Sequence, residues 1–280
     1  MLKQRVITAL VLLAILIPAL FASTSLPFTA VVLVLMAAAS WEWGCLNGWS
    51  KSAALVLAGV CLAACGVLWW AGLVFQVSPW LWQFVGVVWV LVAAALMRGG
   101  VACWGHIPKA IRLWGGMAFL VLAWLAVAQA RALGVEFVLS IFTLVWVADI
   151  AAYFSGRAWG KRKLAPAISP GKSWAGVYGA LVGVVVMAGA WIAVDRMSGQ
   201  PVPSLYVSLL NQSALLLVVG TLFLTVMSVV GDLVESLVKR SVGVKDSSNL
   251  LPGHGGVLDR IDALIPVLPL AMMLFSWTLV

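Results

Sequence analysis

The stretch Trp174–Val194, WAGVYGALVGVVVMAGAWIAV, has no acidic, basic or amide side chain in 21 residues. A helix of that length spans about 30 Å, the thickness of the hydrocarbon core of a bilayer. The whole chain has a similar character: 64% of its residues are hydrophobic and 9% are charged, against about 25% charged in soluble domains. So apolar a chain has too few polar groups to cover a surface in water, and we therefore expect a membrane protein.

Further apolar runs can be placed on both sides of this stretch. The nine runs cover residues 6–22, 28–45, 53–75, 80–97, 114–131, 137–154, 174–194, 205–230 and 258–274. We predict an all-α polytopic membrane protein of about nine transmembrane helices, with spans 1–4 in residues 1–112 and spans 5–9 with the catalytic loops in 113–280. The eighth run is long, so we expect it to tilt or to begin before the membrane. The first run resembles a signal peptide, but Leu20-Phe21-Ala22 is a poor cleavage site, so we expect it to be retained.

Lysine and arginine are unevenly divided between the two sides that this count defines. Fifteen fall on the side of the N-terminus, and two, Arg131 and Arg196, fall on the other. Loops rich in Lys and Arg face the cytosol. We therefore predict a cytosolic N-terminus and a C-terminus outside.

Six of the nine acidic residues gather near the cytosolic ends of spans six, eight and nine. These six are Asp149, Asp232, Glu235, Asp246, Asp259 and Asp262. Glu42 lies toward the cytosolic end of the second span, whereas Glu136 and Asp195 fall at the outer side. Carboxylates at a membrane are costly unless they are paired or functional. Their gathering at one interface favours an enzyme over a transporter, whose polar site usually lies near the midplane between repeats.

The densest polar stretch is Ser236–Asp262, SLVKRSVGVKDSSNLLPGHGGVLDRID. Gly231–Arg240, which overlaps its start, is amphipathic and predicts a short helix on the cytosolic side, before the last span. Gly243–Gly256 is rich in glycine and predicts a loop. The last span is expected to begin at Val257. The stretch therefore combines a loop with charged helix ends at the cytosolic interface.

The acidic and basic residues of this stretch indicate an anion site with a metal. Asp259 and Asp262 lie three apart on one expected helix face, where each raises the pKa of the other unless a cation intervenes. Carboxylate oxygens completed by substrate phosphates suit Mg²⁺. Nearby lysines and arginines would neutralise the phosphates. Basic residues after a span can also be plain membrane anchors. The acidic residues beside them are not explained by anchoring, so we favour the anion site.

This stretch resembles the signature of phosphatidate cytidylyltransferases (CDP-diacylglycerol synthases). The pattern is Ser, then Lys-Arg three residues on, then Lys-Asp, Pro-x-His-Gly-Gly and Asp-Arg-x-Asp. Residues 149–157 and 168–174 resemble the family's other cytosolic segments, whereas residues 1–110 match only as generic spans. The resemblance implies transfer of the cytidylyl group of CTP to phosphatidic acid, giving CDP-diacylglycerol and pyrophosphate for phospholipid synthesis. It also implies a divalent cation, a homodimer among membrane lipids and no nucleic-acid partner; the compact chain suggests a bacterial inner membrane.

The resemblance and the charge pattern together assign roles. The expected catalytic residues are Asp232, Lys239, Asp259 and Arg260, with Asp232 and Asp259 as ligands of Mg²⁺. The expected substrate-binding residues are Asp149, Ser169, Lys172, Ser173, Arg240, Lys245, Asp246, His254, Gly255, Gly256 and Asp262. Asp149, Asp246 and Asp262 are second candidates for contact with the metal or the nucleotide. His254 has no assigned chemistry, and a structural hydrogen bond is the alternative for it.

Other interpretations remain as alternatives. Residues 169–173 are not a P-loop, because Pro166 stands where a glycine is required and no strand is expected before it. A phosphate-binding turn at Lys172–Trp174 competes there with a plain membrane anchor. A phosphatidyltransferase that consumes CDP-diacylglycerol resembles a pattern beginning Asp-Gly, which the chain lacks. A lipid transporter and a silent scaffold are the remaining classes. The four cysteines lack the spacing of a zinc site.

Overall fold

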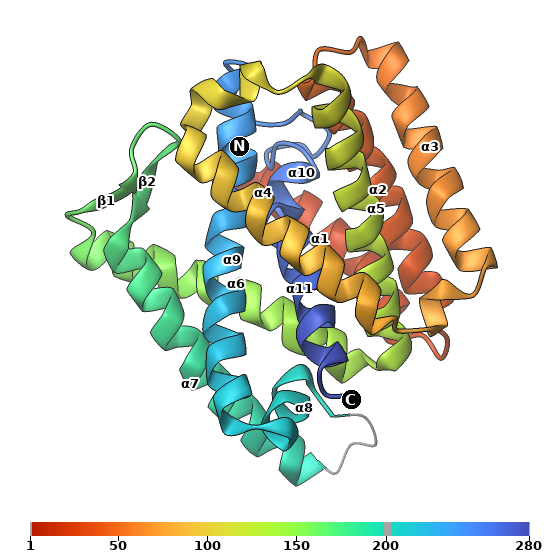
Figure 1. Cartoon of the computed structure of the whole chain (residues 1–280), viewed down its shortest axis with the longest axis vertical. Helices are drawn as coiled ribbons and strands as arrows, with labels where there is room; N and C mark the ends of the chain where they lie inside the picture. Colours follow the sequence, from red (N-terminus) through yellow and green to blue (C-terminus); the bar gives the residue numbers. More distant parts are fainter. Residues whose placement is uncertain (1, 199–202, 280) are drawn as a thin grey trace.

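The computed structural model describes residues 2–198 and 203–279, and Figure 1 shows a chain that is almost entirely helical. Its elements are α1 (Leu2–Leu20), α2 (Leu26–Leu46), α3 (Lys51–Trp70), the 3₁₀ helix η1 (Leu73–Phe75), α4 (Pro79–His106), α5 (Lys109–Leu133), α6 (Val135–Trp159), β1 (Lys163–Ala165), β2 (Ser169–Ser173), α7 (Trp174–Ser198), α8 (Leu205–Gln212), α9 (Ala214–Ser241), α10 (Leu258–Ile261) and α11 (Leu264–Ser276).

Seven of these helices are long and apolar enough to cross a membrane. They are α2, α3, α4, α5, α6, α7 and α9. The prediction of a helical, polytopic membrane protein is thereby confirmed at this coarser level. The division at residue 112 falls inside α5, which packs against both α2 and α3.

The eighth predicted run is two helices rather than one. Ser213 is extended, with φ −168° and ψ 138°, and its hydroxyl accepts a hydrogen bond from the Leu215 amide. This is an N-cap, which ends α8 and starts α9. The prediction of a separate amphipathic helix at residues 231–240 is wrong, because these residues belong to α9, which continues without a break to Ser241.

The last predicted run is also interrupted. α10 ends at Ile261, and the 13 residues of α11 span only about 20 Å. Pro266 has no amide hydrogen to donate to the preceding turn, which explains the interruption. Gly231 of α9 lies against it: a Cβ there would be 2.7 Å from the carbonyl oxygen of Asp262 and 2.6 Å from the Pro266 ring. The missing side chain lets the two segments cross closely and brings Asp232 to Asp262.

α11 lies in the middle of the molecule (Figure 1), and most of its side chains are buried. It contacts α4, α5, α6, α8 and α9. α2 packs against α3 and α5, and α6 packs along α7. The helices before and after residue 134 are therefore joined through α11.

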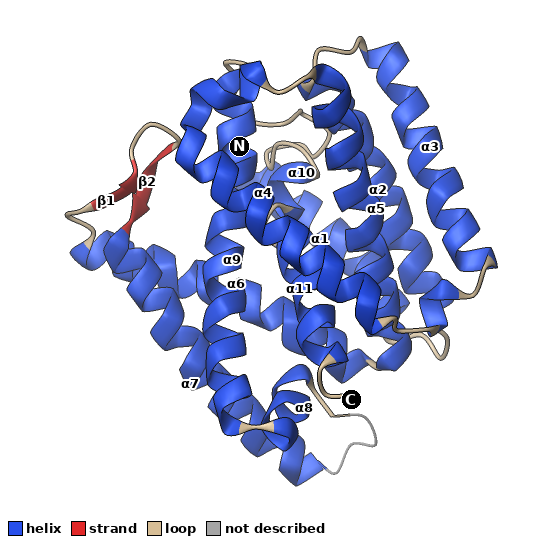
Figure 2. Cartoon of the chain, viewed as in Figure 1, coloured by secondary structure: helices blue, strands red, loops and turns tan. Residues whose placement is uncertain are grey.

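A small antiparallel hairpin of β1 and β2 projects from the bundle (Figure 2), and the sequence did not predict it. Lys163 pairs with Ser173, and Ala165 pairs with Ser169. β1 precedes residues 169–173, so the expectation that no strand lies before this stretch was wrong. The P-loop remains excluded by Pro166 alone.

Several segments far apart in sequence meet at one end of the bundle. The Thr8 hydroxyl of α1 donates to the Pro252 carbonyl at 3.0 Å. Near the end of α2, Glu42 accepts a hydrogen bond from the Val257 amide. Lys172, just before α7, forms an ion pair with Asp232 near the end of α9. The charged residues of the predicted site therefore share this end.

Candidate active site

A lysine between two carboxylates lies where the end of α9 meets α10. Lys239 Nζ is 2.6 Å from Asp259 Oδ1 and 2.5 Å from Glu235 Oε2. Glu235 and Lys239 are one turn apart on α9, so both reach the same side of the helix. The exposed fractions of the Lys239, Glu235 and Asp259 side chains are 11%, 8% and 5%. This buried triad fixes α9 against the start of α10.

Asp259 also holds the loop between α9 and α10. Its carboxylate accepts hydrogen bonds from the amides of Ser247 (2.9 Å) and Gly256 (2.7 Å) and from the Ser247 hydroxyl (3.0 Å). These hydrogen bonds and the ion pair with Lys239 offset the cost of burying the Asp259 charge. Asp259 therefore joins both ends of this loop, residues 242–257 and hereafter the motif loop, to α9.

A polar cavity of about 490 Å³ lies between α6, the hairpin, α7 and α9. Asp149, Lys172, Ser173 and Asp232 are among the residues that line it. Lys172 Nζ is 2.8 Å from Asp232 Oδ2 and also donates to the Val229 carbonyl at 3.2 Å. The Lys172 and Asp232 side chains are 22% and 34% exposed, so the pair is accessible to a ligand in the cavity.

Asp262 lies close to the charges of this polar cavity. The Asp262 carboxyl is close enough to the Asp232 carboxylate to be repelled by it and close enough to Lys172 to be attracted by it. Asp149 adds a third carboxylate to the same field. Three carboxylates thus lie around the Lys172 amine, and Arg157 is a second cation on the wall of the polar cavity.

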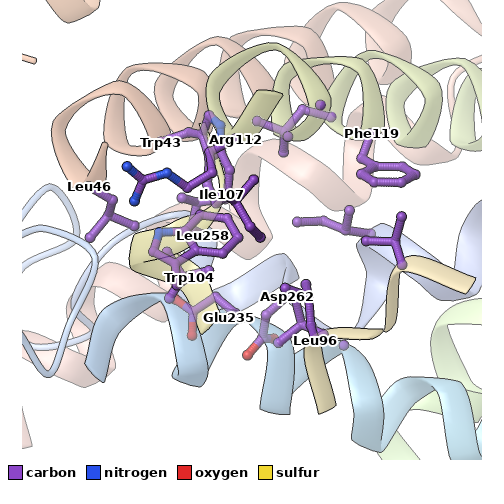
Figure 3. Close-up of a pocket in the computed structure, with 18 of the residues that line it drawn as sticks. Trp43, Leu46, Leu96, Trp104, Ile107, Arg112, Phe119, Glu235, Leu258 and Asp262 are labelled. Carbon is purple, nitrogen blue, oxygen red and sulfur yellow. The ribbon is translucent and has the colours of Figure 1, made fainter. Parts of the chain in front are cut away.

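A second cavity, of about 180 Å³, is lined almost entirely by apolar groups from α2, α4, α5, α9, α10 and α11. Figure 3 shows Trp43, Trp104 and Arg112 grouped at one end of it and Phe119 at the other, with Glu235 and Asp262 along the wall. A bend of α4 at Gly100, where φ is 63°, turns the helix end that carries Trp104. The Arg112 guanidinium lies 5.5 Å from the centre of the Trp104 ring.

The described residues contain no group of three or more His, Cys, Asp or Glu that could hold a metal ion as they stand. The donor chemistry nevertheless fits a hard divalent cation, because Asp149, Asp232 and Asp262 present carboxylate oxygens in or beside the polar cavity. Asp259 is already matched by Lys239 and by loop amides. A cation at Asp259 would have to replace one of these partners, so its role as a ligand stays a prediction.

Two predicted basic residues of the motif support local structure. Arg240 donates to the Ile168 carbonyl at 3.4 Å, which joins α9 to the hairpin, and to the Val244 carbonyl at 3.3 Å. Arg260 donates to the His254 carbonyl at 2.8 Å. His254 Nδ1 is buried and has no hydrogen-bond partner in the described part of the chain, so the geometry assigns it no chemistry.

The remaining predicted residues lie around these two centres. Lys245 and Asp246 are exposed on the motif loop. Ser173 caps α7 by accepting a hydrogen bond from the Gly176 amide at 3.2 Å. Ser169 pairs in the hairpin. Gly255 has a φ of 84° and leaves room for the Asp259 carboxylate, so Gly255 and Gly256 shape the loop.

Three residues of this region were not among the predicted site residues. Glu235 was recognised as one of six acidic residues near the cytosolic ends of the spans, although it pairs with Lys239 and shares that lysine with Asp259. Glu42 was recognised only as an acidic residue near the end of a span. Arg112 was counted only as a cytosolic positive charge. The available signal was the scarcity of charge: a carboxylate inside an apolar run requires a partner.

Comparisons with known proteins extend beyond the motif. The profile of the "Cytidylyltransferase family" matches residues 3–278. A phosphatidate cytidylyltransferase of Pseudomonas aeruginosa is 38% identical over 284 residues, which cover 96% of this chain and 95% of the relative. That of Haemophilus influenzae is 36% identical over 294 residues and 96% of each chain. One from Bacillus subtilis is 41% identical over 143 residues, 51% of this chain and 48% of its own.

Proposed function

The chain belongs to the cytidylyltransferase family and makes CDP-diacylglycerol from CTP and phosphatidate, and we propose that the transfer occurs where its polar and apolar cavities meet. The observation that carries this proposal is the position of Asp262. Its side chain lines the apolar cavity and faces the charge of Asp232, which lines the polar cavity. A reaction between a soluble nucleotide and a lipid requires such a junction.

The two substrates differ in the cavity that suits them. The polar cavity offers Lys172 and Arg157 to the phosphates of CTP. The apolar cavity offers tryptophan, phenylalanine and leucine side chains to an acyl chain of phosphatidate. Arg112, beside Trp104, is placed to contact the lipid phosphate.

In the proposed reaction, an oxygen of the phosphatidate phosphate attacks the α-phosphorus of CTP. A new P–O bond forms, the bond from the α-phosphorus to the bridging oxygen breaks, and pyrophosphate leaves with that electron pair. The nucleophile is already an anion, so the protein has little proton transfer to perform. Its residues hold two anions together and offset charge that develops on the leaving group.

Mg²⁺ is the cation we propose, held by Asp232 and Asp259, with Asp149, Asp246 and Asp262 as further candidates. When bound, it would neutralise phosphate charge and orient the triphosphate. Asp232 is the better supported ligand, because it is partly exposed in the polar cavity. Lys172, Lys239, Arg240, Lys245 and Arg260 are the proposed phosphate-binding cations.

Metal binding at Asp259 can be tested with Asp259→Asn assayed over a series of Mg²⁺ concentrations. We expect kcat to fall by orders of magnitude while the protein stays in the membrane. Near-normal activity at saturating Mg²⁺ would rule out Asp259 as a ligand. Asp262→Asn, assayed beside it, distinguishes the neighbouring carboxylate.

The proposed membrane placement puts the charged end of the bundle in the cytosol, where CTP is available. Nine crossings, with the N-terminus inside and the C-terminus outside, agree with the fifteen Lys and Arg residues on that side. The bacterial relatives indicate an inner membrane. A C-terminal alkaline phosphatase fusion should be active in the periplasm; an inactive fusion made in normal amount would contradict this orientation. A homodimer stays a prediction.

The cavity assignment can be tested by filling the apolar cavity with Ile265→Trp. We expect the KM for long-chain phosphatidate to rise about tenfold or more, since a blocked pocket loses acyl contacts, whereas the KM for CTP and for a short-chain soluble phosphatidate should change little. Val186→Trp, at a position 67% exposed on α7, is the matched control. Equal losses with short-chain and long-chain lipids would contradict the assignment.

A further inference from the structure

Glu42 is a buried carboxylate of the N-terminal half that contacts the motif loop. It lies near the end of α2 and is 0% exposed. It accepts hydrogen bonds from the amides of Val257 (2.9 Å) and Leu258 (2.7 Å). It also accepts hydrogen bonds from the hydroxyls of Ser247 (3.2 Å) and Ser248 (2.5 Å). All four donors lie more than 200 residues away in the sequence.

The four donors belong to the two ends of one loop segment. Ser247 and Ser248 lie near its beginning, and Val257 and Leu258 lie where it enters α10. α10 has no side-chain cap of its own, so Glu42 supplies the acceptor that its first amides need. Gly256 allows the close approach, because a Cβ there would overlap both the Glu42 carboxylate and the Ser247 hydroxyl.

Glu42 is linked to the reacting centre through Ser247. The same hydroxyl lies within hydrogen-bond distance of Glu42 and of Asp259, to which the Ser247 amide also donates. Asp259 in turn pairs with Lys239. A displaced Ser247 would therefore move Asp259 relative to α9, and a misplacement of about 1 Å can cost on the order of 100-fold in rate.

A carboxylate is the side chain that these four donors require. Among residues 2–198 and 203–279, Glu42 forms no ion pair with Lys or Arg, and neutral donors alone satisfy it. A glutamine would replace one acceptor oxygen with NH₂. Serine hydroxyls could adapt by accepting from it, but Val257 or Leu258 would be left with an amide facing a donor.

We propose that Glu42 is a positioning residue for cytidylyl transfer: it fixes both ends of the motif loop and thereby aligns Asp259 with Lys239. The inference rests on the proposed function, and it deepens it by assigning a task to the N-terminal helices. Glu42 does not contact the reacting atoms in this account. Its effect passes through Ser247 and the start of α10.

The test compares wild type, Glu42→Gln and Ser248→Ala as full-length protein purified in detergent. Activity is measured with CTP and phosphatidate and expressed per folded molecule, with the folded fraction taken from thermal unfolding. We expect Glu42→Gln to lower kcat by about 10- to 100-fold with less than threefold change in the KM for CTP. Ser248→Ala, which keeps the carboxylate, should lose less than fivefold. Glu136→Gln is the control.

Hydrogen exchange provides a readout independent of activity. We expect amides of Val257 and Leu258 to exchange at least tenfold faster in Glu42→Gln than in wild type. Glu42→Asp, which keeps both oxygens on a shorter side chain, should restore part of the activity. If kcat per folded molecule and amide exchange both match wild type, the proposal for Glu42 is wrong. If wild type itself makes no cytidine lipid, the proposed function fails instead.

Discussion

Replacing Lys239 by methionine should strongly destabilise the protein. The ammonium lies 2.5 Å from Glu235 and 2.6 Å from Asp259, in side chains no more than 11% exposed. Lys239→Met keeps most of the side-chain volume and removes the charge, so the carboxylates of Glu235 and Asp259 lose the cation that lies between them. Breaking a buried pair in this way costs about 3–5 kcal/mol. Activity should fall too, because Asp259 would no longer be held against α9.

The assay is reversible unfolding of purified protein in mixed detergent, followed by tryptophan fluorescence and compared at equal lipid content. Glu235→Gln in the Lys239→Met background removes one of the two stranded charges and should recover about 1–3 kcal/mol. Lys163→Met changes an exposed lysine of β1 and should stay within about 0.5 kcal/mol of wild type.

Two results would refute the reasoning about this triad. Lys239→Met could be as stable as wild type, which would mean that the carboxylates are not buried together. The double variant could be no more stable than Lys239→Met alone, which would mean that repulsion between Glu235 and Asp259 is not the cause of the loss.

Two further perturbations follow from the geometry. Asp232→Asn keeps the shape of the side chain but removes its charge from the polar cavity. We expect kcat to fall at least 100-fold, since the loss of one electrostatic contact to the transition state has that magnitude. Membrane fractionation should show normal insertion, and activity above a tenth of wild type would contradict the catalytic role of Asp232. Gly231→Ala puts a methyl group into the crossing of α9 with the α10–α11 junction and should cost about 1–3 kcal/mol in unfolding free energy. Gly59→Ala, in open space on α3, is its control, and equal stability of the two variants would show that the crossing is not tight.

The membrane character and most of the helices could be predicted from apolar runs, because a run of about 20 uncharged residues has the length of a membrane-spanning helix, which satisfies all its backbone hydrogen bonds internally. The breaks at Ser213 and before Pro266 were missed. Ser213 acts as a cap only in the backbone conformation it adopts, and the interruption before α11 comes from the missing amide hydrogen of Pro266, which itself counts as an apolar residue. Neither is a property of the local hydrophobic pattern.

The motif did not predict the partners of its own residues. Lys239 and Asp259 were both named, yet their pairing depends on how α10 meets α9. Glu42 was missed because its four donors lie more than 200 residues away, a separation at which a single sequence carries no pairing signal. The apolar cavity was missed for the same reason, because it is assembled from helices across the whole chain.

The most direct test of cytidylyl transfer follows two labels of CTP into the lipid. Purified protein is incubated with phosphatidate, Mg²⁺ and CTP labelled at either the α- or the γ-phosphorus, and the organic phase is counted beside the pyrophosphate released. Attack at the α-phosphorus predicts that α-label enters the lipid in equal amount to pyrophosphate and that γ-label stays in the aqueous phase. Lipid labelled from the γ-phosphorus, or no CTP-dependent lipid product, would contradict the account.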